Sequence, residues 1–188
     1  PSTPVSAAGS LSIRLTSPNA RPVLVGSEVD IDLVFSAANV SPGVSLTEIY
    51  LSYNPNLVEP VSMDPYVAVV ARSGFFDQVP IFSPSFVLTD PPPGLCDVTP
   101  CIYLLVGGPV QTTKSGAVAR FHFRAIAQGV AKFEVVSYKI NDADGHNVDD
   151  ITVTSLNVET VFSGVEIAEG AVFRQGTDPS LLACTTVI

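Results

Sequence analysis

Apolar residues alternate with polar ones along several segments of the chain, and this pattern restricts the fold more than any other feature. Leu11, Ile13 and Leu15 alternate with polar residues, and the pattern returns between Val29 and Phe35. Successive side chains of a β-strand point to opposite faces, so such segments are expected to be half-buried strands. No segment keeps helical spacing over three turns. The sequence therefore predicts an all-β domain.

The same pattern, interrupted by Gly, Pro, Asn and Asp, predicts the remaining strands. They are expected near residues 44–53, 85–89, 101–106, 117–126, 131–137, 151–158 and 161–167. Residues 67–85 lack a clear period, so we allow a short strand or helical turn at 67–71 and an irregular passage through Phe75 and Phe76. Short strands at about ten-residue intervals predict an antiparallel sandwich or jelly roll. Its expected core contains Ile31, Leu33, Phe35, Ile49, Leu51, Phe121 and Phe123.

Composition limits both the number of domains and the classes of partner. The chain has 188 residues, of which 46% are hydrophobic and 14% charged. We expect one packed domain at 11–170, a linker at 1–10 and a C-terminal extension or linker at 171–188. The net charge of −9 repels phosphate backbones, which argues against nucleic acid. No apolar run approaches the roughly 20 residues of a membrane-spanning helix, so membrane insertion is not expected.

Two cysteines lie close together in a loop rich in Pro and Gly. Cys96 and Cys101 are five positions apart, a spacing at which a small disulfide loop can close. Such a bridge would indicate an oxidising, extracellular compartment. The alternative is a pair of reduced thiols. Cys184 would remain, either free or paired with another chain.

Five segments, in chain order, are similar to motifs of the cohesin family. They are 26–31 (GSEVDI), 51–60 (LSYNPNLVEP), 114–125 (KSGAVARFHFRA), 141–145 (NDADG) and 164–167 (GVEI). Cohesins are the dockerin-binding modules of cellulosome-type and related extracellular scaffold proteins. The resemblance implies a nine-stranded antiparallel jelly roll with no catalytic role, from an extracellular or cell-surface prokaryotic protein. It also suggests a scaffoldin involved in polysaccharide degradation.

The chain departs from the family pattern at three places. Asn54 stands where Asp is usual, residues 67–85 look like an insertion, and the cysteine loop is not expected of a cohesin. These departures put the class of partner in doubt more than the fold.

The resemblance also points to a binding face, because one cohesin sheet, built partly from the third and sixth strands, receives the dockerin helices. With Ile49 and Leu51 pointing inward, the outward side chains of residues 44–53 are Leu46, Glu48, Tyr50 and Ser52. Glu48 sits where the family commonly has a polar residue that hydrogen-bonds the dockerin. Tyr50 would add contact area. Tyr103 and Leu105 share a face of the 101–106 strand and are further candidates. The alternative is an ordinary solvated sheet face.

Two other functions are weighed against dockerin binding. A carbohydrate-binding module would need an aromatic platform, which the absence of Trp and the presence of only five Tyr disfavour. A structural spacer of a cell-surface protein would have no tight partner. No Gly-x-Ser-x-Gly sequence and no zinc-ligand spacing occurs, so an enzyme is not expected.

Arg120, His122 and Arg124 alternate with Phe121 and Phe123, which gives this strand one basic face. A phosphate or carboxylate could bind there. The interpretation we favour is an ordinary solvated strand face.

An acidic segment offers a weak calcium candidate formed by Asp142, Asp144 and Asp149. It does not fit an EF-hand loop, because Ile140 would fall at the first ligand position. A tight turn around Gly145 is the alternative that we favour. We expect no cofactor in this chain, whereas a dockerin partner would carry its own calcium.

The Cys96–Cys101 pairing predicts a thiol count. The unfolded, unreduced protein should show one free thiol, that of Cys184, in a colorimetric assay. After reduction the count should rise to three. Three thiols before reduction would mean that the loop cysteines are not paired.

Overall fold

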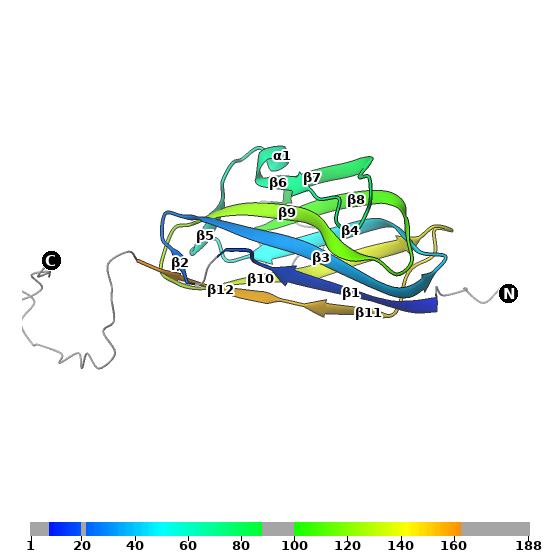
Figure 1. The fold of residues 1–188 in the computed structure, drawn as a ribbon. Coiled ribbons are helices and arrows are strands. Elements are labelled where there is room, and N and C mark those ends of the chain that lie inside the picture. Colours follow the sequence, from blue (N-terminus) through cyan, green and yellow to red (C-terminus); the bar gives the residue numbers. More distant parts are fainter. Residues whose placement is uncertain (1–7, 20–21, 88–99, 163–188) are drawn as a thin grey trace, which may run out of the picture.

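The computed structural model describes residues 8–19, 22–87 and 100–162, and most of these residues lie in β-strands (Figure 1). One six-stranded sheet, sheet A, contains β1 (Ala8–Thr16), β3 (Glu28–Ser41), β5 (Val58–Pro60), β6 (Val69–Ala71), β9 (Ser115–Ala125) and β11 (Ile151–Thr154). The other, sheet B, contains β2 (Val23–Leu24), β4 (Val44–Tyr53), β7 (Ile81–Val87), β8 (Cys101–Gln111), β10 (Gly129–Asp142) and β12 (Leu156–Val161).

The chain crosses repeatedly between the two sheets, as in a jelly roll. Sheet A has the order β11-β1-β3-β9-β5, with β6 also pairing with β9, and sheet B has the order β2-β12-β10-β4-β8-β7. Neighbouring strands are antiparallel except β1 with β11 and β2 with β12. The predicted all-β jelly-roll sandwich is confirmed. The predicted count of nine strands is not, because the described residues form twelve, three of them only two or three residues long.

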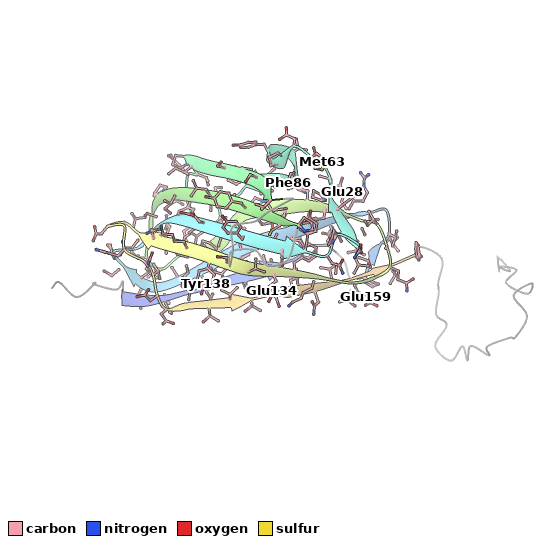
Figure 2. All side chains as sticks on the ribbon, turned by 180° about the vertical axis from the view of Figure 1, so that it is seen from behind. Glu28, Met63, Phe86, Glu134, Tyr138 and Glu159 are labelled. Atoms are coloured by element: carbon pink, nitrogen blue, oxygen red, sulfur yellow. The ribbon has the colours of Figure 1, made fainter. Side chains whose placement is uncertain are left out.

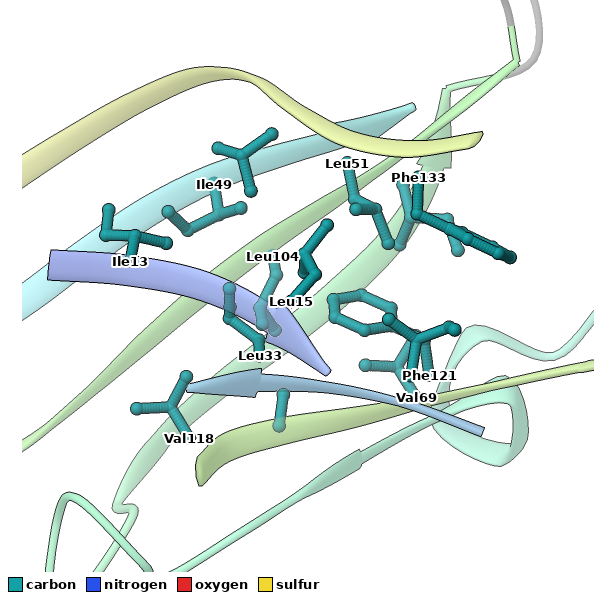
Figure 3. Packing of buried hydrophobic residues seen from close by; sticks show 14 of the residues in the cluster. Ile13, Leu15, Leu33, Ile49, Leu51, Val69, Leu104, Val118, Phe121 and Phe133 are labelled. Atoms are coloured by element: carbon teal, nitrogen blue, oxygen red, sulfur yellow. The ribbon is translucent and has the colours of Figure 1, made fainter. Parts of the chain in front are cut away.

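Side chains from the inner faces of both sheets form one hydrophobic core (Figure 3). Its aromatic part joins the sheets directly, since Tyr53 and Phe133 of sheet B lie 5.0 and 5.1 Å, between ring centroids, from Phe123 of sheet A. Burying one such side chain contributes roughly 1.5–3 kcal/mol. All seven residues predicted for the core are fully buried.

The unclear segment between β5 and β8 closes one edge of the sandwich. Its helix α1 (Pro65–Ala68) begins at Asp64, whose side chain accepts the Tyr66 N–H at 2.9 Å. The segment then adds β6 to sheet A and β7 to sheet B. Both predicted alternatives are therefore present, a helical turn followed by a short strand. No described helix is long and apolar enough to cross a membrane.

Two phenylalanines between β6 and β7 belong to the main core. Phe75 and Phe76 are fully buried with ring centroids 5.0 Å apart, and Phe75 lies 5.5 Å from Phe35 of β3. Glycine allows this close approach: a Cβ on Gly116 would lie 2.2 Å from the carbonyl of Gly74. The passage through Phe75 and Phe76 is thus a part of the core and not a separate cluster.

One predicted strand was wrong, because residues 151–158 form two strands in different sheets. Ile151 and Val153 pack against the core from β11, whereas Val158 does so from β12. The chain changes sheets at Ser155, where the apolar positions pass from odd to even numbers. That change of phase was visible in the sequence. The other boundaries differ mainly in length: β1 begins at Ala8, inside the predicted linker, and most of the predicted 161–167 strand lies outside the described residues.

Replacing Phe75 by Ala should lower the free energy of unfolding by about 3–5 kcal/mol, because it removes a fully buried ring and leaves a cavity. Phe162→Ala is the matched control, since that side chain is 53% exposed and should cost under about 1 kcal/mol. Urea unfolding followed by tyrosine fluorescence measures both. Equal losses in the two variants would contradict the assignment of Phe75 to the core.

Candidate functional site

The six predicted binding residues come together on the outer surface of sheet B, which we call the β4–β8 face. It is formed by Leu46, Glu48, Tyr50 and Ser52 of β4 with Tyr103 and Leu105 of β8. The strands are antiparallel neighbours, with Tyr50 opposite Tyr103 and Glu48 opposite Leu105. Opposite residues point to the same side of a sheet. The register therefore makes a single surface from residues far apart in the sequence.

Two tyrosines occupy the centre of the β4–β8 face. The ring centroids of Tyr50 and Tyr103 are 5.0 Å apart and their planes are inclined by 52°, within the range of favourable aromatic pairs. Both side chains are half-buried. Burial raises the pKa of the Tyr103 phenol, and the charges of Glu48 and Tyr50 raise it further. Tyr103 therefore stays a neutral hydrogen-bonding group at physiological pH.

One end of the face is apolar. The side chain of Leu46 lies over Gly107 of β8, where an added Cβ would be 2.9 Å from Leu46 Cδ1 and 3.5 Å from Ile81 Cδ1. Ile81 belongs to the neighbouring strand β7 and is 44% exposed. Three strands thus contribute to one apolar surface beside the tyrosines.

Ser52 is less available than predicted. It lies on the outer side of β4, but only 7% of its surface is exposed. Its hydroxyl donates to the Glu134 carbonyl at 3.4 Å. Ser52 instead forms part of the wall of a hollow of about 490 Å³, together with Tyr53, residues 54–56, Lys132 and Glu134. Ser52 therefore lines the hollow at the end of the face, and little of its surface is accessible to a partner.

Strand β10 adds polar residues that were not predicted. Ser137 lies opposite Tyr50 and Lys139 lies opposite Glu48. Nearer the start of β10, Glu134 lies opposite Ser52 and also points outward. A bulge at Val136 shifts the alternation by one residue, so that Glu134, Ser137 and Lys139 all lie on the same face. The bulge explains why the sequence pattern alone did not assign Ser137 and Lys139 to this face.

The β4–β8 face is open among the described residues. Figure 2 shows sheet B from outside, with β10 and β4 in front and no other described element drawn across them. The segment that closes the sandwich lies beyond β8, where β7 extends the sheet. The surface is therefore broad enough for another protein element to lie along the strands.

The basic residues predicted on β9 have carboxylate partners on the neighbouring strand. Arg120 donates to both carboxylate oxygens of Asp32, at 2.7 and 2.8 Å, and His122 Nδ1 lies 2.7 Å from Asp30. The hydrogen bond to Asp32 raises the pKa of Arg120. All four side chains are at least three-quarters buried. The outer face of sheet A is thus internally neutralised here, which disfavours a site for an added anion. Of the three basic residues only Arg124 is exposed, so the predicted solvated strand face describes Arg124 but not the paired Arg120 and His122.

The acidic segment after β10 forms a turn. Oδ1 of the buried Asp142 accepts the N–H groups of Asp144 and His146 at 2.9 and 2.8 Å, and Gly145 has a φ of +82°. The described residues contain no group of three or more His, Cys, Asp or Glu side chains placed to hold a metal ion. Asp142, Asp144 and Asp149 are therefore not brought together as calcium ligands.

Cys101, one of the two predicted disulfide partners, is buried at the start of β8. Cys96 lies outside the described residues, as does Cys184, so the bridge stays a prediction.

The proximity of Glu48 to Tyr103 predicts a shift in the titration of the phenol. In Glu48→Gln the carboxylate no longer opposes formation of the phenolate, so Tyr103 should ionise at lower pH than in the wild type. Ultraviolet absorbance near 295 nm measures this, with each protein compared to its Tyr103→Phe counterpart to isolate one tyrosine. An unchanged titration would mean that Glu48 is too remote to act on the face.

Comparison with known proteins gives structural relatives but no sequence relatives. No protein-family model matches the chain, and no curated protein sequence matches it. A non-cellulosomal cohesin from the archaeon Archaeoglobus fulgidus superposes with a TM-score of 0.54 at 15% identity, covering 81% of this chain and 91% of that one.

Two bacterial structures give similar results. A cohesin module from a Clostridium perfringens family 33 glycoside hydrolase has a TM-score of 0.53 at 14% identity, covering 82% of this chain and 98% of that one. A type III cohesin module from the cell-surface anchoring scaffoldin ScaE of Ruminococcus flavefaciens has a TM-score of 0.51 at 11% identity, covering 81% and 88%. The chain therefore has a cohesin-like fold.

Proposed function

We propose that this chain is a non-catalytic protein-binding module that receives a dockerin-type partner on the β4–β8 face. The observation that carries the proposal is the half-buried, outward-facing pair of Tyr50 and Tyr103 at the centre of an open sheet in a cohesin-like fold. Tyrosine is enriched at the energetic centres of protein interfaces, because it offers a large contact area and a hydrogen-bonding group.

The composition of the face suits a helical partner. Leu46, Leu105 and Ile81 supply apolar contact, while Glu48 and Lys139 supply charge at the side of the tyrosines. An amphipathic helix presents this same combination, an apolar stripe bordered by polar residues. The chain's open sheet would accept such helices without rearrangement of its backbone.

Carbohydrate binding is supported less well. The rings of Tyr50 and Tyr103 are inclined to each other by 52°, so they do not form the flat strip on which a polysaccharide would stack. The chain contains no Trp. A spacer role predicts no selective use of the face at all, which the experiment below addresses.

The fold also supports an extracellular or cell-surface setting. One structural neighbour comes from a cell-surface anchoring scaffoldin, and another from a glycoside hydrolase. By analogy we place this chain in a prokaryotic extracellular protein concerned with polysaccharide degradation, with Cys96 and Cys101 bridged. A dockerin partner would bring its own calcium.

Replacing Tyr50 by Ala should weaken binding of a cognate dockerin by about 2 kcal/mol, or about 30-fold, because it removes half of the central aromatic pair. Titration calorimetry with dockerin modules from the source genome measures the change. Thermal melts should show that the variant is folded, since the ring is only half-buried.

Tyr66→Ala is the matched control, because Tyr66 is 58% exposed and lies on α1, outside the six residues that form the β4–β8 face. Its affinity should stay within about two-fold of the wild type. If Tyr50→Ala and Tyr66→Ala bind the dockerin with equal affinity, the binding surface lies elsewhere. If the wild-type chain binds no dockerin at all, the spacer role is favoured.

A further inference from the structure

Glu48 is the acidic group at the centre of the β4–β8 face, and it has no cation of its own. It lies on β4 two residues before Tyr50, on the same face, and opposite Leu105 of β8. Among the described residues no Lys, Arg or His nitrogen lies within ion-pair distance of its carboxylate. The side chain is half-buried, so its negative charge is partly removed from water.

The nearest candidate cation in the register is Lys139 of β10. It is paired directly with Glu48 across the two strands, yet its ammonium group forms no ion pair or hydrogen bond with any described residue. Some other charged side chains of the sheets are paired. Lys132 binds Glu134 at 2.6 Å, and Arg120 binds Asp32 on both oxygens. Glu48 therefore remains available to an external cation.

The surroundings of Glu48 are suited to that cation. Tyr50 and Tyr103 place two electron-rich rings beside the carboxylate, and a cation above an aromatic face gains about 0.5–2 kcal/mol. The negative charge of Glu48 interacts with the Tyr103 phenol and helps to raise its pKa. A carboxylate and two rings together form a negative site beside the apolar end of the face.

We propose that the partner inserts a lysine or arginine side chain between the Glu48 carboxylate and the Tyr50–Tyr103 pair. This inference rests on the proposed function and specifies the chemistry of the partner. The long aliphatic stem of either residue would lie against Leu46 and Leu105, and the charged end would meet Glu48. The chain's net charge of −9 favours approach of such a partner over an acidic one.

The test selects binders against this chain from a display library built on a calcium-loaded, two-helix dockerin scaffold with randomised helix surfaces. Some binders selected on the wild-type chain should bind the Tyr50→Ala variant more weakly. These binders should carry a Lys or Arg at a surface position of a helix. Binders selected on Glu48→Lys should carry Asp or Glu there instead. Calorimetry of a wild-type binder should show a loss of about 10- to 100-fold in Glu48→Lys.

Glu59→Lys is the matched control, because it makes the same change of net charge on β5 of the opposite sheet. The affinity of the Glu59→Lys variant for the wild-type binder should stay within about two-fold of the wild-type value. Melting curves verify that each variant is folded. Raising the salt concentration should weaken binding of the wild type more than that of Glu48→Gln.

Two failures are distinguishable. Binders that need Tyr50 but show neither a cation preference nor any response to Glu48→Lys would overturn the cation site and leave the proposed face in place. Binders that respond to neither Tyr50→Ala nor Glu48→Lys, or a library that gives no binder, would overturn the face and the cation site together.

Discussion

Burial of one side of each strand against the opposite sheet is the constraint on which the rest of the structure depends. Tyr53 and Phe133 from sheet B contact Phe123 from sheet A, and aliphatic residues extend this contact along the sandwich. Each buried side chain opposes a shift in register, because a shift by one residue would turn it into solvent. The outward residues are then fixed in place by the inward ones, which is how β4 comes to present Glu48 and Tyr50.

The two outer faces of the sandwich differ in how their acidic side chains are paired. On sheet A, Asp30 and Asp32 are satisfied by His122 and Arg120 within the sheet, so these two carboxylates have little to offer a charged partner. On sheet B, Glu48 has no ion-pair partner among the residues that the structure describes, and it lies beside two half-buried tyrosines. A half-buried charge gains most from a partner that completes its pairing, because the partial loss of hydration has already occurred in the free protein. This asymmetry supports the proposal that sheet B is the binding surface.

The segment between β5 and β8 has a structural role that keeps this surface open. It seals the edge between the sheets with Phe75 and Phe76 and then extends sheet B sideways through β7. Glycine at positions 74 and 116 lets the two backbones approach where any side chain would collide. The residues added relative to a simple sandwich thus enlarge the core and the sheet, and none of the described ones covers the tyrosine pair.

The sequence by itself determined most of the long strands and their buried sides, because alternation with a period of two is a local property of the backbone. It therefore identified Ile49 and Leu51 as core and Tyr50 as outward, and the ordered motifs pointed to a cohesin-like fold. Only the tertiary structure decided which outward residues meet. The pairing of Tyr50 with Tyr103 and the bulge at Val136 that brings Lys139 opposite Glu48 both depend on contacts between distant segments. Such contacts are set by the packing of the whole core, and no local pattern encodes them.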